Sequence, residues 1–358
     1  MQSKQSTSQL TPARAAENVR KLIDQSQNIL VLCSRPSDID SYGTGAALGW
    51  YLEQLGKTPT VATRFKIEGS LKNSTATKNI QQWDNLSTEN FANKVLDYDL
   101  VIGLDSSSWK NILGENFEEL LEKLTARRMI AHIDHHTPGD IIETIPQTCL
   151  FEPVSCTAEL LYKYFLKPAD MIPPQRFVQW MYEALLYDTN RFRNNNTDVR
   201  TFEFATELLR LGADHLTAID SHIPWEEMLF ASWAIAHTER DLDLRATFLV
   251  IDAQGDKELN ELIGTDWEEY QAFYKDCVLR QIEGIDYGIL INFRKDGTYK
   301  VGWRTRTSGP TVEMKAVFIA AGLDAGGHRN AGGATYEGDV DELVKRLKEE
   351  LKLGLQRL

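Results

Sequence analysis

The sequence of 358 residues contains only four cysteines, and no two of them form a C-x-x-C pair. They are Cys33, Cys149, Cys156 and Cys277. Cysteines scattered in this way predict neither a disulfide framework nor a zinc ribbon. We therefore expect reduced thiols in the interior of the protein.

Long apolar segments are also lacking. No stretch approaches the roughly 18 unbroken apolar residues that a membrane helix needs. The first eleven residues, MQSKQSTSQLT, do not contain the apolar stretch of a signal peptide. These absences predict a cytoplasmic protein that does not act at a membrane.

Positive charge is scarce relative to negative charge. The chain has 39 Lys and Arg residues against 52 Asp and Glu residues, which gives a formal net charge of −13. Affinity for long nucleic acids comes largely from clustered Lys and Arg that displace counterions from phosphates. The charge balance therefore favours a small anionic substrate, held locally by metal ions or by a few arginines.

Several short apolar runs in the first half of the chain are bounded by polar residues, as buried parallel strands are. They lie at 28–33 (NILVLC), 100–104 (LVIGL) and 129–133 (MIAHI). Segments with helical periodicity alternate with these runs, at 12–24, 43–55, 156–165, 174–187 and 198–211. This alternation predicts an α/β domain built on a parallel sheet.

A second region of alternating elements begins near residue 245. Its predicted elements are a helix at 268–280, a hairpin around the turn Lys295-Asp296-Gly297, and helices at 311–321 and 340–353 that flank the glycine-rich loop AGGHRNAGGAT. We predict four parts, namely a disordered tail at 1–11, a first domain at 12–212, a linker at 213–240 and a smaller α/β domain at 241–358.

Acidic and imidazole side chains follow the predicted strands of the first domain. The first strand leads to Asp38 and Asp40, the second to Asp105, and the third to Asp134, His135 and His136. In an open parallel sheet, ligands bind outside the carboxyl ends of the strands, so these clusters can share one crevice. Asp188, at the end of a predicted helix, adds another carboxylate. Hard oxygen ligands with imidazole suit Mn²⁺ or Mg²⁺, and the set predicts a metal site that hydrolyses a phosphate ester.

Each cluster taken alone has an ordinary structural explanation. Asp38 and Asp40 also fit a helix cap, and Asp105 also fits the start of a turn. The adjacent His135 and His136 favour a metal site more strongly, since paired histidines after an apolar strand have little structural purpose. His132 lies within the strand, where we expect a hydrogen-bonded core histidine.

Six segments occur in order along the chain: SRPSDIDSYGTGAALGWYLEQLGK, LDSSS, IDHH, EALLYDTNRF, KVGWRTR and AGGHRNAGGA. The first four resemble the motifs of the DHH phosphoesterase superfamily. The last two resemble the arginine strand and the glycine-histidine loop of its C-terminal DHH-associated domain, found in a branch that includes nanoRNases and pAp phosphatases. The resemblance implies an α/β fold with a parallel-sheet N-terminal DHH domain, a smaller α/β C-terminal domain, and an active site in the cleft between them.

The resemblance also implies a role for each matching residue. The metal ligands would be Asp38, Asp40, Asp105, His135 and Asp188. Asp105 would bridge two ions, His136 would face the scissile phosphate, and Asp134 would orient an imidazole. Substrate would be bound by Arg304, Gly326, Gly327 and His328. The implied activity is that of a Mn²⁺- or Mg²⁺-dependent oligoribonuclease, exonuclease or pAp phosphatase acting on short single-stranded RNA or DNA, pAp or linear dinucleotides, and related proteins are often homodimers.

One position departs from the family pattern. Where the first motif usually has a histidine, four residues before Asp38, this chain has Ser34. A hydroxyl is a poor replacement for imidazole as a ligand, so we expect the first of two metal positions to be weakened. This departure leaves open a second function, a nucleotide-binding sensor that keeps the fold and has lost turnover.

Overall fold

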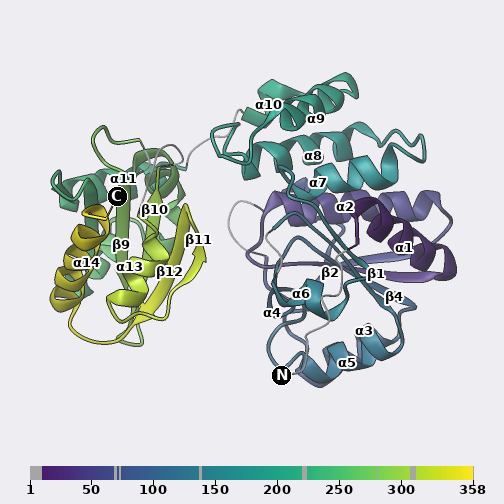
Figure 1. The fold of residues 1–358 in the computed structure, drawn as a ribbon, viewed down its shortest axis with the longest axis horizontal. Helices are drawn as coiled ribbons and strands as arrows, with labels where there is room; N and C mark the ends of the chain where they lie inside the picture. Colours follow the sequence, from purple (N-terminus) through teal and green to yellow (C-terminus); the bar gives the residue numbers. More distant parts are fainter. Residues whose placement is uncertain are drawn as a thin grey trace. The chain divides into compact units, whose positions relative to one another are not determined.

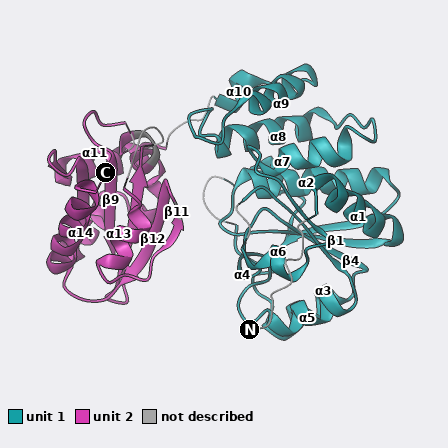
Figure 2. Ribbon diagram, in the orientation of Figure 1, with its two compact units in different colours: residues 1–220 teal, residues 221–358 magenta. Residues whose placement is uncertain are grey.

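The computed structural model describes residues 10–67, 71, 74–136, 139–219, 224–279, 281–306 and 312–357, without the side chains of residues 276, 277 and 328. The chain forms two compact units, residues 1–220 and residues 221–358 (Figure 2). None of the described helices combines the length and the apolar character needed to cross a membrane.

The first unit contains a sheet of six parallel strands in the order β3-β2-β1-β4-β5-β6. Its strands are β1 (Asn28–Cys33), β2 (Thr58–Thr63), β3 (Gln81–Gln82), β4 (Leu100–Leu104), β5 (Ile130–Asp134) and β6 (Cys149–Phe151). Its helices and helical turns are α1 (Pro12–Gln25), α2 (Ile39–Gln54), η2 (Thr75–Thr77), α3 (Thr88–Leu96), α4 (Lys110–Leu113), α5 (Glu118–Ala126), α6 (Asp140–Thr144), α7 (Thr157–Leu161), η3 (Tyr162–Leu166), α8 (Gln175–Asp188), α9 (Val199–Arg210) and α10 (His215–Ile219).

Helices cover both faces of this sheet, so the unit has three layers (Figure 1). In β1, Ile29 and Val31 pack with α1, α2, α7, α8 and α9, whereas Leu30 and Leu32 pack with α3 and α5 on the opposite face. Successive side chains of a strand point to opposite faces. Burial of both faces therefore explains why the strand is an unbroken apolar run.

Helix α2 approaches its neighbours closely because small residues line it. A Cβ atom on Gly45 would lie 2.7 Å from the Cys33 sulfur, and one on Gly43 would lie 3.1 Å from the Cβ of Trp180 in α8. Such distances leave no room for a side chain at Gly45. The helix therefore lies directly against the sheet, and its N-terminus lies at the carboxyl end of β1.

The strand order places a topological switch point between β1 and β4. From β1 the chain proceeds outward through β2 and β3, and from β4 it proceeds in the other direction through β5 and β6. The loops that leave β1 and β4 therefore diverge, and the crevice between them is the usual ligand site of an open α/β sheet. The acidic residues after these two strands lie at this position.

The second unit contains a six-stranded sheet in the order β11-β12-β10-β9-β8-β7, in which β8 and β9 are parallel and the other neighbours are antiparallel. Its strands are β7 (Glu239–Asp241), β8 (Ala246–Ile251), β9 (Tyr287–Phe293), β10 (Tyr299–Thr305), β11 (Gly326–His328) and β12 (Ala331–Tyr336). Its helices and helical turns are α11 (Trp225–His237), α12 (Ala253–Leu262), η4 (Trp267–Tyr270), η5 (Tyr274–Val278), α13 (Met314–Ala320) and α14 (Val340–Leu355).

The two faces of the second sheet are covered differently. On one face, Val301 and Trp303 of β10 belong to a core with α13 and α14. On the other face, Leu249 of β8 and Leu290 of β9 belong to a core with α11, α12 and the turns η4 and η5. This second core lies over β8 and β9, and β10 and β12 extend beyond it.

The predicted α/β architecture is confirmed, with a parallel sheet in the first unit and a second sheet in the other. Two local predictions are wrong. The segment 268–280 contains the two separate helical turns η4 and η5, and the glycine-rich segment predicted as a loop pairs as the hairpin β11–β12. The segment predicted as a linker, 213–240, contains α10 and α11, and Phe230 of α11 is buried in the core of the second unit. The assignment of the two units to a catalytic and a substrate-binding role stays a prediction.

Candidate metal centre

Asp38 and Asp40 lie at the start of α2, directly after β1. Asp38 is the N-cap, and its Oδ1 accepts a hydrogen bond from the backbone N–H of Ser41 at 2.9 Å. Asp40 is fully buried, and its carboxylate accepts hydrogen bonds from the backbone N–H groups of Thr157 (2.6 Å) and Ala158 (3.0 Å). These N–H groups begin α7, so Asp40 fixes the start of that helix.

Asp105 directly follows β4 and is buried. Its backbone φ is +58°, a left-handed conformation that aspartate adopts more readily than most residues. Its N–H donates to the carbonyl of Ile133 at 3.0 Å, and its Oδ1 accepts a hydrogen bond from the Thr157 hydroxyl at 3.0 Å. The Ser34 hydroxyl donates to its carbonyl oxygen at 2.7 Å. Backbone and side chain of Asp105 are therefore both held.

Asp134 ends β5 and holds the imidazole of His136. Its Oδ1 accepts hydrogen bonds from the His136 backbone N–H at 3.1 Å and from the His136 Nδ1 at 2.8 Å. An outer carboxylate in this position fixes both the ring orientation and the tautomer of a functional histidine. This contact directs the second ring nitrogen, Nε2, away from Asp134.

His135 and His132 have different surroundings. The Nδ1 of His135 lies 3.2 Å from the carbonyl oxygen of Val154, which leaves Nε2 to the carboxylates. His132 is fully buried, and its Nε2 lies 2.8 Å from the carbonyl oxygen of Ser106. The prediction that His132 is a hydrogen-bonded core histidine is confirmed.

Asp188 is the last residue of α8 and is held through its backbone. Its carbonyl oxygen accepts hydrogen bonds from the side-chain amides of Asn194 (2.8 Å) and Asn196 (3.3 Å). The amide of Asn196 also donates to the carbonyl of Ser155, at 3.0 Å. The turn after α8 thereby ties Asp188 to the segment that leads into α7.

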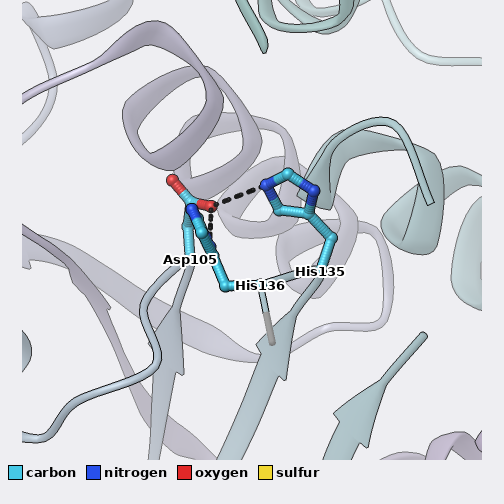
Figure 3. Close-up of side chains that lie close together, drawn as sticks. All are labelled: Asp105, His135 and His136. Atoms are coloured by element: carbon cyan, nitrogen blue, oxygen red, sulfur yellow. Dashed lines mark ion pairs between the residues drawn. The ribbon is translucent and has the colours of Figure 1, made fainter. Parts of the chain in front are cut away.

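The structure brings three of the predicted ligands, Asp40, Asp105 and Asp188, together around a fourth, His135. Its Nε2 lies 3.2 Å from Asp188 Oδ2, 3.6 Å from Asp105 Oδ1 and 3.8 Å from Asp40 Oδ2. His136 Nδ1 lies 3.5 Å from the same Asp105 oxygen, so both imidazoles face one carboxylate (Figure 3). Among the described residues, two groups have ligand atoms that all lie within 4.8 Å of one another. One group is Asp40, His135 and Asp188, and the other is Asp105, His135 and His136. Asp38 belongs to neither group.

The buried carboxylates of this cluster resist ionisation. Burial raises the pKa of Asp38 to about 6, and burial together with the charge of Asp40 raises the pKa of Asp188 to about 7. Burial and the charges of Asp40 and Asp38 raise the pKa of Asp105 well above its ordinary value. Such clusters are costly without a cation.

His135 and Asp134, in contrast, have pKa shifts that favour their charged forms. Burial alone would lower the pKa of His135, but the Asp188 carboxylate, 3.2 Å away, raises it to about 10. Burial alone would raise the pKa of Asp134, but His132 and His136 hold it well below its usual range. The centre thus contains more carboxylates than its imidazoles can neutralise.

These residues fit a divalent cation. Among the described residues, the buried atoms His135 Nε2 and Asp188 Oδ2 have no hydrogen bond of acceptable geometry, although they face each other at 3.2 Å. Two ligands about 2.1 Å from one ion, at right angles to each other, lie about 3 Å apart. The distances around His135 are close to that value, and oxygen ligands with one imidazole suit Mn²⁺ or Mg²⁺.

Two residues that contact the acidic cluster have no structural role predicted from the sequence, namely Thr157 and Ser34. Thr157 contacts two acidic residues at once, through its hydroxyl (Asp105) and its backbone N–H (Asp40). Ser34 is 1% exposed, and its hydroxyl bonds the backbone of Asp105. Neither contact has a local sequence signal, since the partners of the two hydroxyls are 52 and 71 positions away.

Thr157→Val is expected to weaken Mn²⁺ binding by roughly tenfold, a typical loss of affinity when a residue that holds a metal ligand in place is replaced. Valine keeps the shape and the backbone N–H, but it removes the hydroxyl that holds Asp105 Oδ1. Isothermal titration calorimetry with MnCl₂ measures the change. Thr206→Val is the matched control, because that hydroxyl bonds a carbonyl within α9. Equal Mn²⁺ affinity in wild type and Thr157→Val would show that the hydroxyl does not position the ligand.

The predicted substrate-binding residues lie in the second unit. Arg304 is half-buried in β10, and its Nη1 donates to the carbonyl of Trp303 at 3.1 Å. Gly326 and Gly327 lie in β11 and pair with Gly333 and Gly332 of β12. The side chain of His328 lies outside the described part of the chain.

A family model described as the DHH family, N-terminal domain, matches residues 28–187. The chain is similar to an exopolyphosphatase-related protein from Bacteroides fragilis, with 17% identity and a TM-score of 0.77 over 95% of this chain and 96% of the other. It is also similar to RecJ from Thermus thermophilus in complex with Mn²⁺, with 16% identity and a TM-score of 0.52 over 98% of this chain and 55% of the other. At these identities the likeness shows a shared fold.

Proposed function

The chain belongs to the DHH phosphoesterase superfamily through residues 28–187, and from this membership we propose that it is a metal-dependent phosphoesterase of short oligonucleotides or small phosphorylated nucleotides. The proposed substrates are nanoRNA, pAp and linear dinucleotides. The observation that carries the proposal is the convergence of Asp40, Asp105, His135 and Asp188, in which two buried ligand atoms lack hydrogen bonds within the described chain.

A divalent cation bound here would supply Lewis acidity at the phosphoryl oxygens and a water of lowered pKa. We assign Asp40, His135 and Asp188 to hold the tighter ion, and Asp105 to contact it and a weaker ion near Asp38. Mn²⁺ in RecJ supports the choice of Mn²⁺ or Mg²⁺. The Ser34 hydroxyl bonds the backbone of Asp105, which supports a weakened first metal position.

His136 is the group that we assign to the scissile phosphate. Its Nδ1 is engaged with Asp134, so Nε2 is the atom that would hydrogen-bond a phosphoryl oxygen or supply a proton to the leaving oxygen. Asp134 stays ionised because its pKa is held low, and it keeps the imidazole in one orientation. Asp134 is therefore a positioning residue.

We assign substrate binding in the second unit to Arg304, Gly326, Gly327 and His328. A guanidinium binds phosphate in a bidentate manner. Glycines allow backbone amides to approach a phosphate closely.

A substrate panel tests the proposed activity. Purified protein is incubated with Mn²⁺ and pAp, pApA, pGpG, RNAs of three to five residues, cyclic dinucleotides or pyrophosphate, with Asp105→Asn as the inactive control. Release of mononucleotide or phosphate from pAp or the linear oligonucleotides is expected. If wild type releases no more product than the control on every substrate, the hydrolase assignment fails.

Arg304→Lys is expected to raise KM roughly tenfold and to change kcat little, since it removes a bidentate contact that ground state and transition state share. Lysine keeps the charge but loses the planar pair of donors. Steady-state kinetics on the best substrate of the panel measure the effect. Arg210→Lys, an exposed position on α9, is the matched control. A fall in kcat at unchanged KM would contradict substrate binding as the role of Arg304.

The buried Ser34 favours one alternative, a nucleotide-binding sensor with little turnover. In that case nucleotide and one ion would still bind, while the panel would show no product. Metal stoichiometry alone does not separate the two functions, because a sensor can keep an ion. Turnover on the panel decides between them.

A further inference from the structure

A groove with a volume of about 480 Å³ lies on the sheet of the second unit, over β9, β10 and β12. Its described lining contains four basic residues and a single acidic one, although the chain as a whole carries a net charge of −13. The basic residues are Lys275, Arg294, Lys300 and Arg304, and the acidic one is Asp324. Every described lining residue belongs to the second unit.

The pairing of β10 sets the layout of the groove floor. Lys300, Gly302 and Arg304 alternate along β10 and face the groove, while Val301 and Trp303 face the core with α13 and α14. At a rise of about 3.3 Å per residue, the Cα atoms of Lys300 and Arg304 lie about 13 Å apart. Gly302 lies between them and pairs with Leu290 and Gly333 on the neighbouring strands. The floor of the groove therefore carries no side chain on β10 between the two basic residues, Lys300 and Arg304.

The fold does not require glycine at position 302. A Cβ atom there would meet only the carbonyl oxygen of Gly332, at an ordinary contact distance of 3.5 Å. Its φ lies outside the left-handed region. Glycine weakens a strand interior, and it often marks a place where a ligand or another backbone approaches closely. The open space above Gly302 points to a ligand.

Asn292 supplies a polar group to the same groove. It is 3% exposed, and its Nδ2 donates to Oε1 of Gln271 at 3.1 Å. Its Oδ1 and the Nε2 of Gln271 have no hydrogen-bond partner among the described residues. Exchange of oxygen and nitrogen in both amides leaves the same two atom positions unsatisfied. A buried amide with an unmet hydrogen bond suits the edge of a nucleobase.

We propose that this groove binds one nucleoside unit flanked by two phosphates, as in the interior of an oligonucleotide chain. Arg304 binds one phosphate, Lys300 with Arg294 binds the other, and the nucleoside lies over Gly302 with its base edge at Asn292. The inference rests on the proposed function in taking the ligand to be a nucleotide. It adds a preference for ligands that span both cationic ends.

Equilibrium binding in EDTA tests the groove without turnover, with calorimetry on wild type, Gly302→Val and Gly302→Ala. The probes are pApA, AMP and tripolyphosphate at fixed ionic strength. Wild type is expected to bind pApA roughly tenfold more tightly than AMP, because pApA has a second phosphate for the other basic end of the groove. Valine suits a strand and fills the space above Gly302, so Gly302→Val should fold and lose this difference, with Gly302→Ala intermediate.

Lys300→Gln is expected to weaken pApA binding and to reduce the slope of log K against log salt by about 1. Lys345→Gln, at an exposed position of α14, makes the same charge change away from the groove. Melting temperatures of all variants establish that they fold.

Equal affinity of wild type and Gly302→Val for pApA would show that pApA does not bind in this groove. Binding of tripolyphosphate as tight as that of pApA would show that the groove does not recognise the nucleoside. If the substrate panel shows no hydrolysis while wild type still binds pApA more tightly than AMP, the proposed hydrolase function is wrong and the proposed nucleotide binding in the groove is supported. If wild type hydrolyses a substrate of the panel but Gly302→Val binds pApA as tightly as wild type does, only the proposed binding of nucleotide in this groove is wrong.

Discussion

Asp105→Asn is expected to lower kcat at least about a thousandfold, a loss of roughly 4 kcal/mol of transition-state stabilisation. Asparagine keeps the shape of the side chain and tolerates the φ of +58° at this position. Its amide oxygen still accepts the hydrogen bond from Thr157. The substitution therefore removes one negative charge and one of the proposed metal ligands with little change to the fold.

The same variant is expected to have a higher melting temperature than wild type in EDTA. Burial, together with the charges of Asp40, Asp38 and Asp188, raises the pKa of Asp105. Removing a carboxylate from this cluster relieves repulsion that only a cation offsets. Asp24→Asn, at an exposed position of α1, is the control.

Kinetics on the best substrate, Mn²⁺ titration by calorimetry and thermal unfolding in EDTA are measured on the same preparations. Turnover within tenfold of wild type, together with unchanged Mn²⁺ affinity, would exclude Asp105 as a metal ligand. A lower melting temperature in EDTA would contradict the electrostatic account of the cluster.

Mn²⁺ at a hundred times its Kd is expected to raise the melting temperature of the first unit by roughly 5–10 °C at pH 8, from a binding contribution of about 2.7 kcal/mol. At pH 5.5 the same Mn²⁺ concentration is expected to give a much smaller increase. Carboxylates must lose their protons to bind the ion, so protons compete with it.

The sign of the pH effect follows from the raised pKa values. The pKa of Asp188 is about 7 in the folded protein, against about 4 in the unfolded chain. Between these values the folded state binds a proton that the unfolded state has lost, so the metal-free protein loses stability as the pH rises through 7. His135, with a pKa of about 10, contributes stability that is lost as the pH rises further toward 10.

Thermal unfolding between pH 5.5 and pH 8, with Mn²⁺ or with EDTA, measures both effects. The EDTA series should fall in melting temperature as the pH rises, and the difference between the two series should widen. Asp105→Asn is the control, in which the Mn²⁺ increase should be small at every pH. A Mn²⁺ increase that does not depend on pH would contradict the assignment of Asp188 as a ligand.

The sequence reveals the strands of the first unit because they are buried on both faces. The runs at 28–33 and 100–104 coincide with β1 and β4, and the acidic residues after them lie at the switch point. The edge of the same sheet is harder to predict. Strand β2 (TPTVAT) is only partly buried and contains proline and three threonines, so it lacks an apolar run.

The errors in the second unit have local causes. The segment 268–280 has helical periodicity, but the structure divides it into the turns η4 and η5, which share one core with α11. The glycines of the β11–β12 hairpin have low strand propensity, and their pairing depends on close contact with β10 and Trp303. Tertiary contacts therefore determine the secondary structure of both segments.

The contacts that hold the candidate metal ligands in place are also tertiary. The roles of Thr157 and Ser34 depend on which strand end and which helix start meet in space, and a serine or threonine at these positions has no local pattern that reveals its partner. Residue type therefore predicts the candidate ligands, whereas the contacts that hold them in place can be read only from the structure.

The double use of Asp40 bears on how such a protein can change over generations. The same carboxylate that we assign to the ion also begins α7, through the N–H groups of Thr157 and Ala158. A lineage that abandoned hydrolysis and kept the fold could replace His136, which is partly exposed, at little structural cost. Replacing Asp40 would leave the buried N–H groups of Thr157 and Ala158 without an acceptor, so this aspartate should be retained even after the proposed activity is lost.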